Sequence, residues 1–423
     1  MELDYNKTFI HNFIVNVLDG AFFGFALGFA SFVTLLPLFV STMTNSAILI
    51  GLIPAVHTVG WQFPQLLIAN HVSKQKKFLP LVLWLTIHER LPFLGLALTA
   101  WFLPIIGVKI GLIFTFIMLI WQGLGGGFTA SAWQAMISKI IPGERRGTFL
   151  GTQASASSLL GALGAVLSGL TLERFTHPIN FSLCFIFACI PMVFSFIFVA
   201  QTREKESIPI EPKNQQHVFR HKLRDILRND MNFRWFLIIR MLSQVATMGF
   251  AFYTVYAVRN YGMNVGLAGL MTGILMATQI VANPIMGWIG DRLGHRIVMG
   301  AGVLAASIST VLASFATHIS WFYIIYILAG IANVALWTIS MTMTLEFGSE
   351  SDRPAYIGLA NTLISPIAIL APLLGGWLAD NTGYPITFRI SAVAGLLTVL
   401  VLLIKLRNTR RVVEDYSWQI ASK

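Results

Sequence analysis

Long apolar runs separated by short polar stretches recur along the whole chain. Each run holds roughly 20 residues, which as an α-helix is long enough to cross a hydrocarbon layer about 30 Å thick. Strands of a membrane barrel would instead show ~10 residues of alternating polarity. The pattern therefore predicts an all-α polytopic membrane protein with twelve transmembrane helices. The predicted spans are residues 13–40, 46–69, 78–102, 107–136, 148–172, 178–200, 233–258, 265–289, 297–317, 321–346, 355–379 and 386–406.

One predicted loop is longer and more charged than the others. It covers residues 201–232 and follows the sixth span. The sequence thus predicts a six-helix bundle over 1–200, a cytoplasmic central loop, and a second six-helix bundle over 233–423 with a short cytoplasmic tail. Within the loop, HVFRHKLRDILRN (217–229) has the mixed basic and apolar pattern of a helix that lies on a membrane surface.

The composition supports a membrane protein. Charged residues make up 11% of the chain and hydrophobic residues 56%, whereas soluble domains average about 25% charged residues. The net charge of +11 would suggest a nucleic-acid partner in a soluble protein. In a membrane protein it is better explained by Lys and Arg collecting in cytoplasmic loops. With both termini in the cytoplasm, four of the 29 basic residues fall in loops on the opposite side, namely Lys109, Arg174, Arg259 and Arg389. We therefore expect an integral protein of the cell membrane with no nucleic-acid partner.

The two halves of the chain repeat one another. ERRGTFLG (144–151) aligns with SDRPAYIG (351–358), an offset of 207 positions that matches Arg146 to Arg353 and Gly151 to Gly358. Each segment opens a predicted span, the fifth and the eleventh. Two parallel six-helix repeats are a recurring design of transporters, in which the substrate site lies near the bilayer midplane between the repeats.

The segment GWIGDRLGHR (287–296), between the eighth and ninth spans, resembles the signature loop of the major facilitator superfamily, roughly G-x-x-x-D-R-x-G-R-[RK]. His295 takes a position that is usually basic. The resemblance implies two pseudo-symmetric six-helix bundles that work by alternating access, with this loop latching neighbouring helices while the transporter faces outward. The positions that match the signature are Gly287, Asp291, Arg292, Gly294 and Arg296.

The signature loop leads to specific expectations about its contacts. Asp291 is expected to accept hydrogen bonds from the N-terminus of the eleventh span, where the helix dipole favours a carboxylate. Arg292 or Arg296 is then expected to meet Glu346 at the end of the tenth span. Arg353, at the start of the eleventh span, completes this predicted gating set.

The chain also departs from the family patterns. The equivalent loop of the first half (66–77) has Asn70 where an acid is expected, and Leu119 stands where an arginine would precede the WQGLGGG segment (121–127). The fifth span, with SSLLGALGAVLSG, lacks the G-P-x-x-G-G pattern associated with drug antiporters. The superfamily assignment is therefore favoured more strongly than the drug-export subtype.

Ionisable residues inside the predicted spans are candidates for proton coupling, because each costs about 2.5–3.5 kcal/mol on insertion scales and usually faces a cavity or a partner. Arg90 lies roughly 18 Å into the third span, and Asp19 about 9–12 Å into the first, so a long arginine side chain bridges the difference. We expect Asp19 to carry the proton, with Arg90 as its electrostatic partner and Glu89 or His57 assisting. The alternative is a fixed ion pair that only joins helices.

The second half holds one cation clearly within a span, Arg240, surrounded by amides. Trp337 lies one turn from Asn333, on the same face of a regular helix. These groups suit a substrate that carries hydroxyls, a ring or an anionic group. The alternative for each amide is a hydrogen bond between helices, worth about 0.6–2 kcal/mol. The predicted substrate-binding residues are Arg240, Gln244, Gln279, Asn283, Asn333, Trp337 and Asn361, with Gln122 from the first half.

No catalytic motif emerges from the sequence: H-E-x-x-H, G-x-S-x-G and the phosphate-binding loop are all missing. We therefore expect no enzymatic activity, cofactor or metal, and energy drawn from an ion gradient or from the substrate's own gradient. The preferred interpretation is a monomeric, proton-coupled secondary transporter that exports a small amphipathic molecule. Uptake of a polar solute such as a sugar is the rival, and a membrane sensor that moves nothing is the third possibility.

Overall fold

The computed structural model describes residues 2–32, 35–44, 47–206, 215–263, 265–350 and 352–407. These ranges are helical almost throughout and contain no strand. Within them, eleven helices are long and apolar enough to cross a membrane. The predicted second span is the exception, because it is divided into two shorter helices. The all-α fold with twelve spans is confirmed.

The first half contains eight α-helices and one short 3-10 turn. Their bounds are α1 (Glu2–Phe29), α2 (Leu35–Ser41), α3 (Ala47–Gln62), α4 (Gln65–Val72), α5 (Leu79–Ile106), α6 (Val108–Ile140), η1 (Gly143–Arg145), α7 (Arg146–Arg174) and α8 (Ile179–Ala200). The predicted first span is divided between α1 and α2. The predicted second span is divided between α3 and α4 at Pro64, which lacks the amide hydrogen that a continuous helix needs.

The second half begins with the helix predicted within the central loop. Its elements are α9 (Gln215–Asn229), α10 (Met231–Ala246), η2 (Met248–Phe252), α11 (Tyr253–Tyr261), α12 (Val265–Leu293), α13 (His295–Phe315), α14 (Trp321–Val334), η3 (Ala335–Ile339), α15 (Ser340–Thr344), α16 (Arg353–Thr382) and α17 (Tyr384–Lys405). The predicted seventh span is interrupted by the 3-10 turn η2, and the tenth by the π-helical turn η3. Both turns shift the phase of the helix and so change which side chains share a face.

Two compact units are present. The first comprises Met1–Pro142, Gln153–Glu211 and Ser349–Thr362, and the second Gly143–Thr152, Pro212–Gly348 and Leu363–Lys423. The first residues of α7 thus belong to the second unit, and the first residues of α16 to the first unit.

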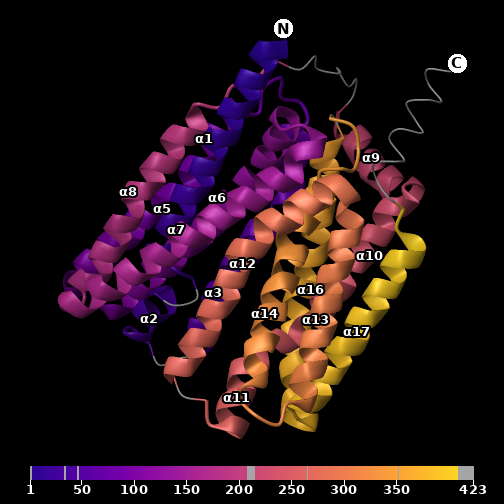
Figure 1. The fold of residues 1–423 in the computed structure, drawn as a ribbon. Helices are drawn as coiled ribbons and strands as arrows, with labels where there is room; N and C mark the ends of the chain where they lie inside the picture. The colour runs from indigo at the N-terminus through magenta and orange to yellow at the C-terminus, as the bar shows by residue number, and fades with distance from the viewer. Residues whose placement is uncertain are drawn as a thin grey trace, which may run out of the picture. The chain divides into compact units, whose positions relative to one another are not determined.

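Each unit has its own apolar core. In the first, α5 packs against α6 and α8, and α1 packs against α8 (Figure 1), around phenylalanines such as Phe39, Phe93 and Phe185. In the second, α13 packs against α14 and α17 around Tyr253 and Phe322. Large apolar side chains also cover the outer faces of many helices, as expected where lipid replaces water.

The glycine-rich segment of α6 lets two neighbouring helices approach closely. A β-carbon added at Gly125 would lie 2.5 Å from the carbonyl oxygen of His88 on α5, and one at Gly127 would lie 2.3 Å from that of Gly60 on α3. Small residues at such positions allow backbones to pack against one another in a membrane. The WQGLGGG segment therefore determines how α5, with its charged triplet, sits against α6.

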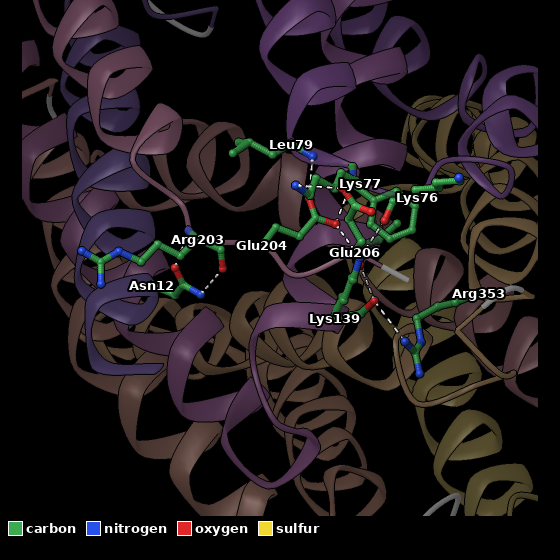
Figure 2. A network of polar contacts seen from close by, with 12 residues as sticks. Asn12, Lys76, Lys77, Leu79, Lys139, Arg203, Glu204, Glu206 and Arg353 are labelled. Carbon is green, nitrogen blue, oxygen red and sulfur yellow. Dashed lines mark hydrogen bonds and ion pairs between the residues drawn. The ribbon is translucent and has the colours of Figure 1, made fainter. Parts of the chain in front are cut away.

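The segment that follows α8 is bound to the first unit by a side chain of α1. The Asn12 Nδ2 donates to the Arg203 carbonyl at 2.8 Å, and the Arg203 amide donates to the Asn12 Oδ1 at 2.8 Å (Figure 2). Asn16, one turn further along α1, donates to the Thr202 hydroxyl at 3.0 Å. The beginning of the central loop is therefore a fixed part of this unit.

Glu204 uses this position to hold the start of α5. Its carboxylate accepts the backbone amides of Phe78 at 2.9 Å and Leu79 at 2.8 Å, and it pairs with the Lys139 ammonium at 2.9 Å (Figure 2). The Glu204 side chain is only 1% exposed. A carboxylate at a helix N-terminus satisfies free amides and interacts favourably with the helix dipole. The helix that carries Glu89 and Arg90 is thus anchored at its first turn.

Candidate functional site

Arg90 joins three helices of the first unit. Its Nη2 lies 3.2 Å from the Asp19 Oδ1 on α1 and donates to the Ser195 hydroxyl on α8 at 2.7 Å. The Ser195 hydroxyl in turn donates to the same Asp19 oxygen at 2.6 Å. The Arg90 and Asp19 side chains are 11% and 10% exposed, so the three groups form a closed triangle almost out of reach of solvent. The ion pair predicted from their depths is present.

Glu89 contacts the same arginine more loosely. Its Oε2 lies 3.9 Å from the Arg90 Nη1 and 3.5 Å from the Thr86 hydroxyl. The other carboxylate oxygen is directed towards α6, where a β-carbon added at Gly126 would lie 3.0 Å from it and 3.4 Å from Trp61. Two buried carboxylates therefore share one guanidinium, but only Asp19 is held by short contacts.

The neighbouring His88 points in a third direction. The Trp121 indole donates to its Nδ1 at 3.2 Å, and the Trp84 ring meets it edge-on with centroids 5.7 Å apart. Successive residues of a helix are rotated by about 100°. The three consecutive charged or titratable residues of α5 therefore point in three directions, and the contacts of Arg90 reach α1 and α8.

His57 and Gln122 form a second polar pair in the first unit. The His57 Nδ1 lies 3.1 Å from the Gln122 Oε1, and its ring stacks on Phe32 at 3.9 Å between centroids. Gln122 is buried, and its Nε2 has no hydrogen-bond partner within the described ranges. His57 thus contacts Phe32 and Gln122, not the Asp19–Arg90 pair. A buried amide N–H without a partner is costly and marks a place where a ligand or water can bind.

The amides of the second half are partly engaged in contacts between helices. The Asn283 Oδ1 accepts the Thr338 hydroxyl at 2.6 Å, and its Nδ2 donates to the Gln279 carbonyl at 2.9 Å. Arg240 and Gln244 are half-buried on α10, and the Arg240 guanidinium lies 5.8 Å from the centre of the Phe236 ring.

The remaining predicted substrate-binding residues are spread over both units. Asn361 belongs to the first unit, where its Nδ2 donates to the Gln65 Oε1 on α4 at 2.6 Å. Asn333 on α14 is half-buried, whereas Trp337 is 58% exposed. The π-helical turn η3, which contains Trp337, breaks the regular spacing that would place it on the face of Asn333.

Asp291 binds the start of α7, not the start of the eleventh span. Its Oδ1 accepts the Gly147 amide at 2.9 Å, and its Oδ2 accepts the Thr148 amide and hydroxyl, each at 2.6 Å. The prediction of its partner was wrong, because the first residues of α7 belong to the second unit. The chemistry is as predicted, since a carboxylate caps a helix N-terminus. Gly287 also lies on Gly147, where a β-carbon would clash with the Gly147 carbonyl.

Glu346 contacts His295, so the prediction that Arg292 or Arg296 would meet Glu346 was also wrong. The His295 Nδ1 lies 2.7 Å from the Glu346 Oε1. Arg292 lies over the Trp288 ring at 4.1 Å, and the Arg296 Nη2 donates to the Leu403 carbonyl at 2.6 Å. Gly294, with φ of 99°, ends the turn before α13 and directs His295 inward.

The internal repeat extends to contacts between side chains. The Arg146 Nη1 donates to the Leu345 carbonyl at 3.2 Å in the second unit, and the Arg353 Nη1 donates to the Ser138 hydroxyl at 3.1 Å in the first (Figure 2). The offset that relates Arg146 to Arg353 also relates Ser138 to Leu345. Equivalent arginines thus make equivalent contacts in the two units.

Two residues that shape this site, Ser195 and Glu204, were not predicted from the sequence. Ser195 is a lone serine within an apolar run, and such serines usually bond to their own helix, so nothing marks it out. Glu204 lies in a charged loop segment, TREKE, in which each residue suggests an exposed surface. Only the folded chain shows that Glu204 lies at the first turn of α5, the helix that carries Arg90.

Known proteins resemble this chain over most of its length. The multidrug resistance protein MdtG of Escherichia fergusonii is 25% identical over 297 residues, 68% of this chain and 70% of the relative. The gentisate transporter of Corynebacterium glutamicum is 24% identical over 301 residues, 67% of this chain and 65% of the relative. Both similarities are distant and extend beyond a single motif.

Solved structures show the same fold. The E. coli fucose:proton symporter FucP aligns with a TM-score of 0.72 at 15% identity, covering 95% of this chain and 100% of the symporter. The human organic anion transporter MFSD10 aligns with a TM-score of 0.71 at 13% identity, covering 93% and 99%. The Major Facilitator Superfamily model matches residues 78–258 and 236–419. With its spans, repeat and signature loop, the chain belongs to the Major Facilitator Superfamily of transporters.

Proposed function

We propose that this protein exports a small amphipathic organic molecule in exchange for protons. The observation that carries the proposal is the pair of buried carboxylates, Asp19 and Glu89, that share the Arg90 guanidinium within the spans. With both acids ionised, the cluster carries one net negative charge, and one proton makes it neutral. Because unbalanced charge inside a membrane protein is costly, such a cluster is suited to bind and release one proton.

Glu89 is the better candidate for the proton carrier. Asp19 is tied to Arg90 and Ser195 by short contacts, so protonating it would sacrifice a fixed ion pair. Glu89 lies farther from the guanidinium and beside Gly126 and Trp61. We therefore assign the exchangeable proton to Glu89 and a structural role to the Asp19–Arg90 pair, which reverses the order expected from the sequence.

The names of the relatives favour export of an amphipathic substrate. Several are multidrug resistance proteins, and another is the class H tetracycline resistance protein of Pasteurella multocida, 24% identical over 143 residues. Aromatic rings lie near both polar pairs of the first unit, with Phe23 5.3 Å from the Arg90 guanidinium and Phe32 stacked on His57. Rings beside polar groups suit a substrate with an apolar body and a polar end. By contrast, Asn283 and Asn361 are already engaged, which weakens the case for a sugar site.

Orientation and assembly are part of the same proposal. The distribution of Lys and Arg supports cytoplasmic termini and a location in the cell membrane. A single chain then works as a monomer by alternating access, with the 201–232 segment joining its two six-helix halves, residues 1–200 and 233–423.

Proteoliposomes loaded with a pH dye test the proposal. Purified protein is exposed to separate pools of aromatic amphiphiles, aromatic acids and sugars, and internal pH is followed with labelled substrate. We expect proton movement with the amphiphiles, and Glu89→Gln is expected to abolish it while substrate exchange without a gradient persists. Glu173→Gln, at an exposed glutamate of α7, serves as the matched control. Proton movement with sugars alone, or full coupling in Glu89→Gln, would overturn the assignment.

A further inference from the structure

Gln122 presents an unused hydrogen-bond donor inside the first unit. It lies on α6 in the glycine-rich segment, and the residue is only 1% exposed. Its Nε2 carries two N–H groups and has no hydrogen-bond partner among the residues that the structure describes. Buried polar groups are normally paired. This nitrogen is therefore a group that a bound molecule can satisfy.

The oxygen of the same amide is already engaged. The Gln122 Oε1 lies 3.1 Å from the His57 Nδ1 on α3. An amide oxygen accepts and never donates, so the imidazole donates from Nδ1 and determines which end of the amide remains available. The His57 ring is itself held by stacking on Phe32, with 3.9 Å between centroids and 20° between planes. His57 is thus a positioning residue for the amide nitrogen of Gln122.

The surroundings of this pair are closely packed and aromatic. A β-carbon added at Gly123 would lie 3.1 Å from the Val56 carbonyl oxygen, so the backbones of α3 and α6 approach closely beside Gln122. Phe32 is 7% exposed and meets Phe93 edge-on, with 6.5 Å between centroids. Aromatic walls with a few directed polar groups are typical of sites for small organic molecules. An amide N–H binds an acceptor oxygen, and the rings pack against an aromatic body.

A carboxylate lies one helical turn from Gln122. Gly126 follows Gln122 by four residues, about 6 Å along α6, and a β-carbon added at Gly126 would lie 3.0 Å from the Glu89 Oε1. When it is ionised, Glu89 repels a second negative charge placed nearby, and inside a membrane protein little water screens that repulsion. The acceptor oxygen that suits Gln122 is therefore an uncharged one.

We propose that the Gln122 amide binds the carbonyl oxygen of an uncharged aromatic ketone or amide, which defines the substrate class of the exporter. This assignment rests on the proposed function, because it specifies the molecule that is moved. The carbonyl accepts from the Gln122 Nε2, the aromatic body packs beside Phe32 and the His57 ring, and Glu89 disfavours aromatic acids. Gln122 is covered in this structure, so the ligand reaches the amide when alternating access opens the site.

Equilibrium dialysis against the purified protein in nanodiscs tests the assignment with probes of matched size, and empty nanodiscs correct for partition into lipid. Acetonaphthone offers an uncharged acceptor and ethylnaphthalene offers none, whereas naphthoate is an anion and benzindole only donates. We expect acetonaphthone to bind about tenfold more tightly than ethylnaphthalene, the effect of about one net hydrogen bond. Naphthoate and benzindole should bind no more tightly than ethylnaphthalene.

Variants separate the amide from its surroundings. Gln122→Leu nearly keeps the volume and removes both N–H groups, so acetonaphthone and ethylnaphthalene should bind within about twofold of each other. His57→Phe keeps a ring on Phe32 but releases the Gln122 oxygen, so the amide can turn and the preference for acetonaphthone over benzindole should disappear. Gln134→Leu is the matched control and should keep the preference. Gln134 also lies on α6, is 1% exposed, and has an amide without a partner in the described part of the chain.

The probes and His57→Phe keep the test decisive if Gln122→Leu does not fold. Equal binding of acetonaphthone and ethylnaphthalene to the wild type, tighter binding of naphthoate or benzindole, or an unchanged preference in Gln122→Leu would refute the assignment. Dialysis needs no proton gradient. The expected selectivity without coupled proton movement in proteoliposomes would therefore support the role of Gln122 and overturn only the proposed exchange with protons.

Discussion

Arg90 shows how much one side chain contributes inside a membrane. Its guanidinium is the only cation that contacts Asp19 and Glu89 within the described residues. Each acid is buried, so the arginine stabilises charge that has no water to solvate it. The helices α1, α5 and α8 are joined at this point by ions and a hydroxyl, within otherwise apolar faces.

Replacing Arg90 should therefore destabilise the protein strongly, and a second substitution should restore part of the lost stability. Arg90→Gln leaves two buried acids without a cation, and breaking a buried pair costs about 3–5 kcal/mol. Adding Asp19→Asn to this variant removes one of the uncompensated charges and should restore part of the loss. Thermal unfolding in detergent measures both variants. If the double variant is no more stable than Arg90→Gln, the pair contributes through shape and not through charge.

The Ser195 hydroxyl is predicted to contribute less than the charges it joins. Ser195→Ala should destabilise the protein by about 0.6–1.7 kcal/mol, the range for hydrogen bonds between membrane helices. It should also shift the pH dependence of transport, because Asp19 loses a donor and shares Arg90 with Glu89, to which the exchangeable proton is assigned. Ser182→Ala on the same helix removes an equally buried hydroxyl that donates to the Ala97 carbonyl. Equal pH profiles for the two variants would show that Ser195 has only a packing role.

Among the elements, α5 depends on contacts at both its first turn and its middle. Glu204 accepts hydrogen bonds from the amides of the first turn, and the middle of α5 packs against the glycines of α6. The helix is thereby fixed in height and rotation, which directs Glu89 towards α6 and Arg90 towards α1 and α8.

The anchoring of α5 can be tested by comparing two glutamates of the same loop. Glu204→Gln removes a charge that accepts two helix amides, and hydrogen bonds to charged groups contribute about 1.5–3 kcal/mol. Glu206→Gln removes a carboxylate that is 67% exposed in its pair with Lys77, for which about 0–1 kcal/mol is expected. Faster hydrogen exchange at residues 78–82 should accompany the first change and be absent after the second.

The fit between α5 and α6 is predicted to tolerate no added methyl group. In Gly125→Ala the new carbon would lie 2.5 Å from the His88 carbonyl, and overpacking of this kind costs about 1–3 kcal/mol. Transport should fall with stability, because Glu89 moves with α5. Gly169→Ala on α7, with nothing within 4 Å of the added carbon, should be neutral or slightly stabilising in the same melting and transport assays.

At the scale of the whole molecule, the repeat and the distribution of charge predict an orientation in the membrane. In intact cells, a membrane-impermeant maleimide should label Lys109→Cys, and it should label Lys76→Cys only after the membrane is opened. The native Cys184 and Cys189 lie within the span of α8, so the unchanged protein should remain unlabelled. Labelling of Lys76→Cys in intact cells would reverse the proposed orientation.

The two halves are alike in fold but differ in the side-chain contacts that their equivalent loops make. In the second unit, Asp291 caps α7 and His295 bridges to Glu346. The first-half loop has Asn70 in place of an acid, and the start of α16 instead contacts the first unit through Arg353 and Asn361. The turn in which an acid caps the start of a helix is therefore a feature of the second half.

The sequence by itself determined the number and approximate ends of the spans, because a helix in lipid must satisfy its backbone internally and needs about 20 apolar residues. It also determined the repeat, the family and the pairing of Asp19 with Arg90, since depth along a helix can be counted. Tertiary structure decided which side chains meet: Ser195 with Asp19, His295 with Glu346, and Asp291 with α7. Rotation about a helix axis depends on packing against neighbours, and turns such as η3, with its exposed Trp337, change that rotation within a span.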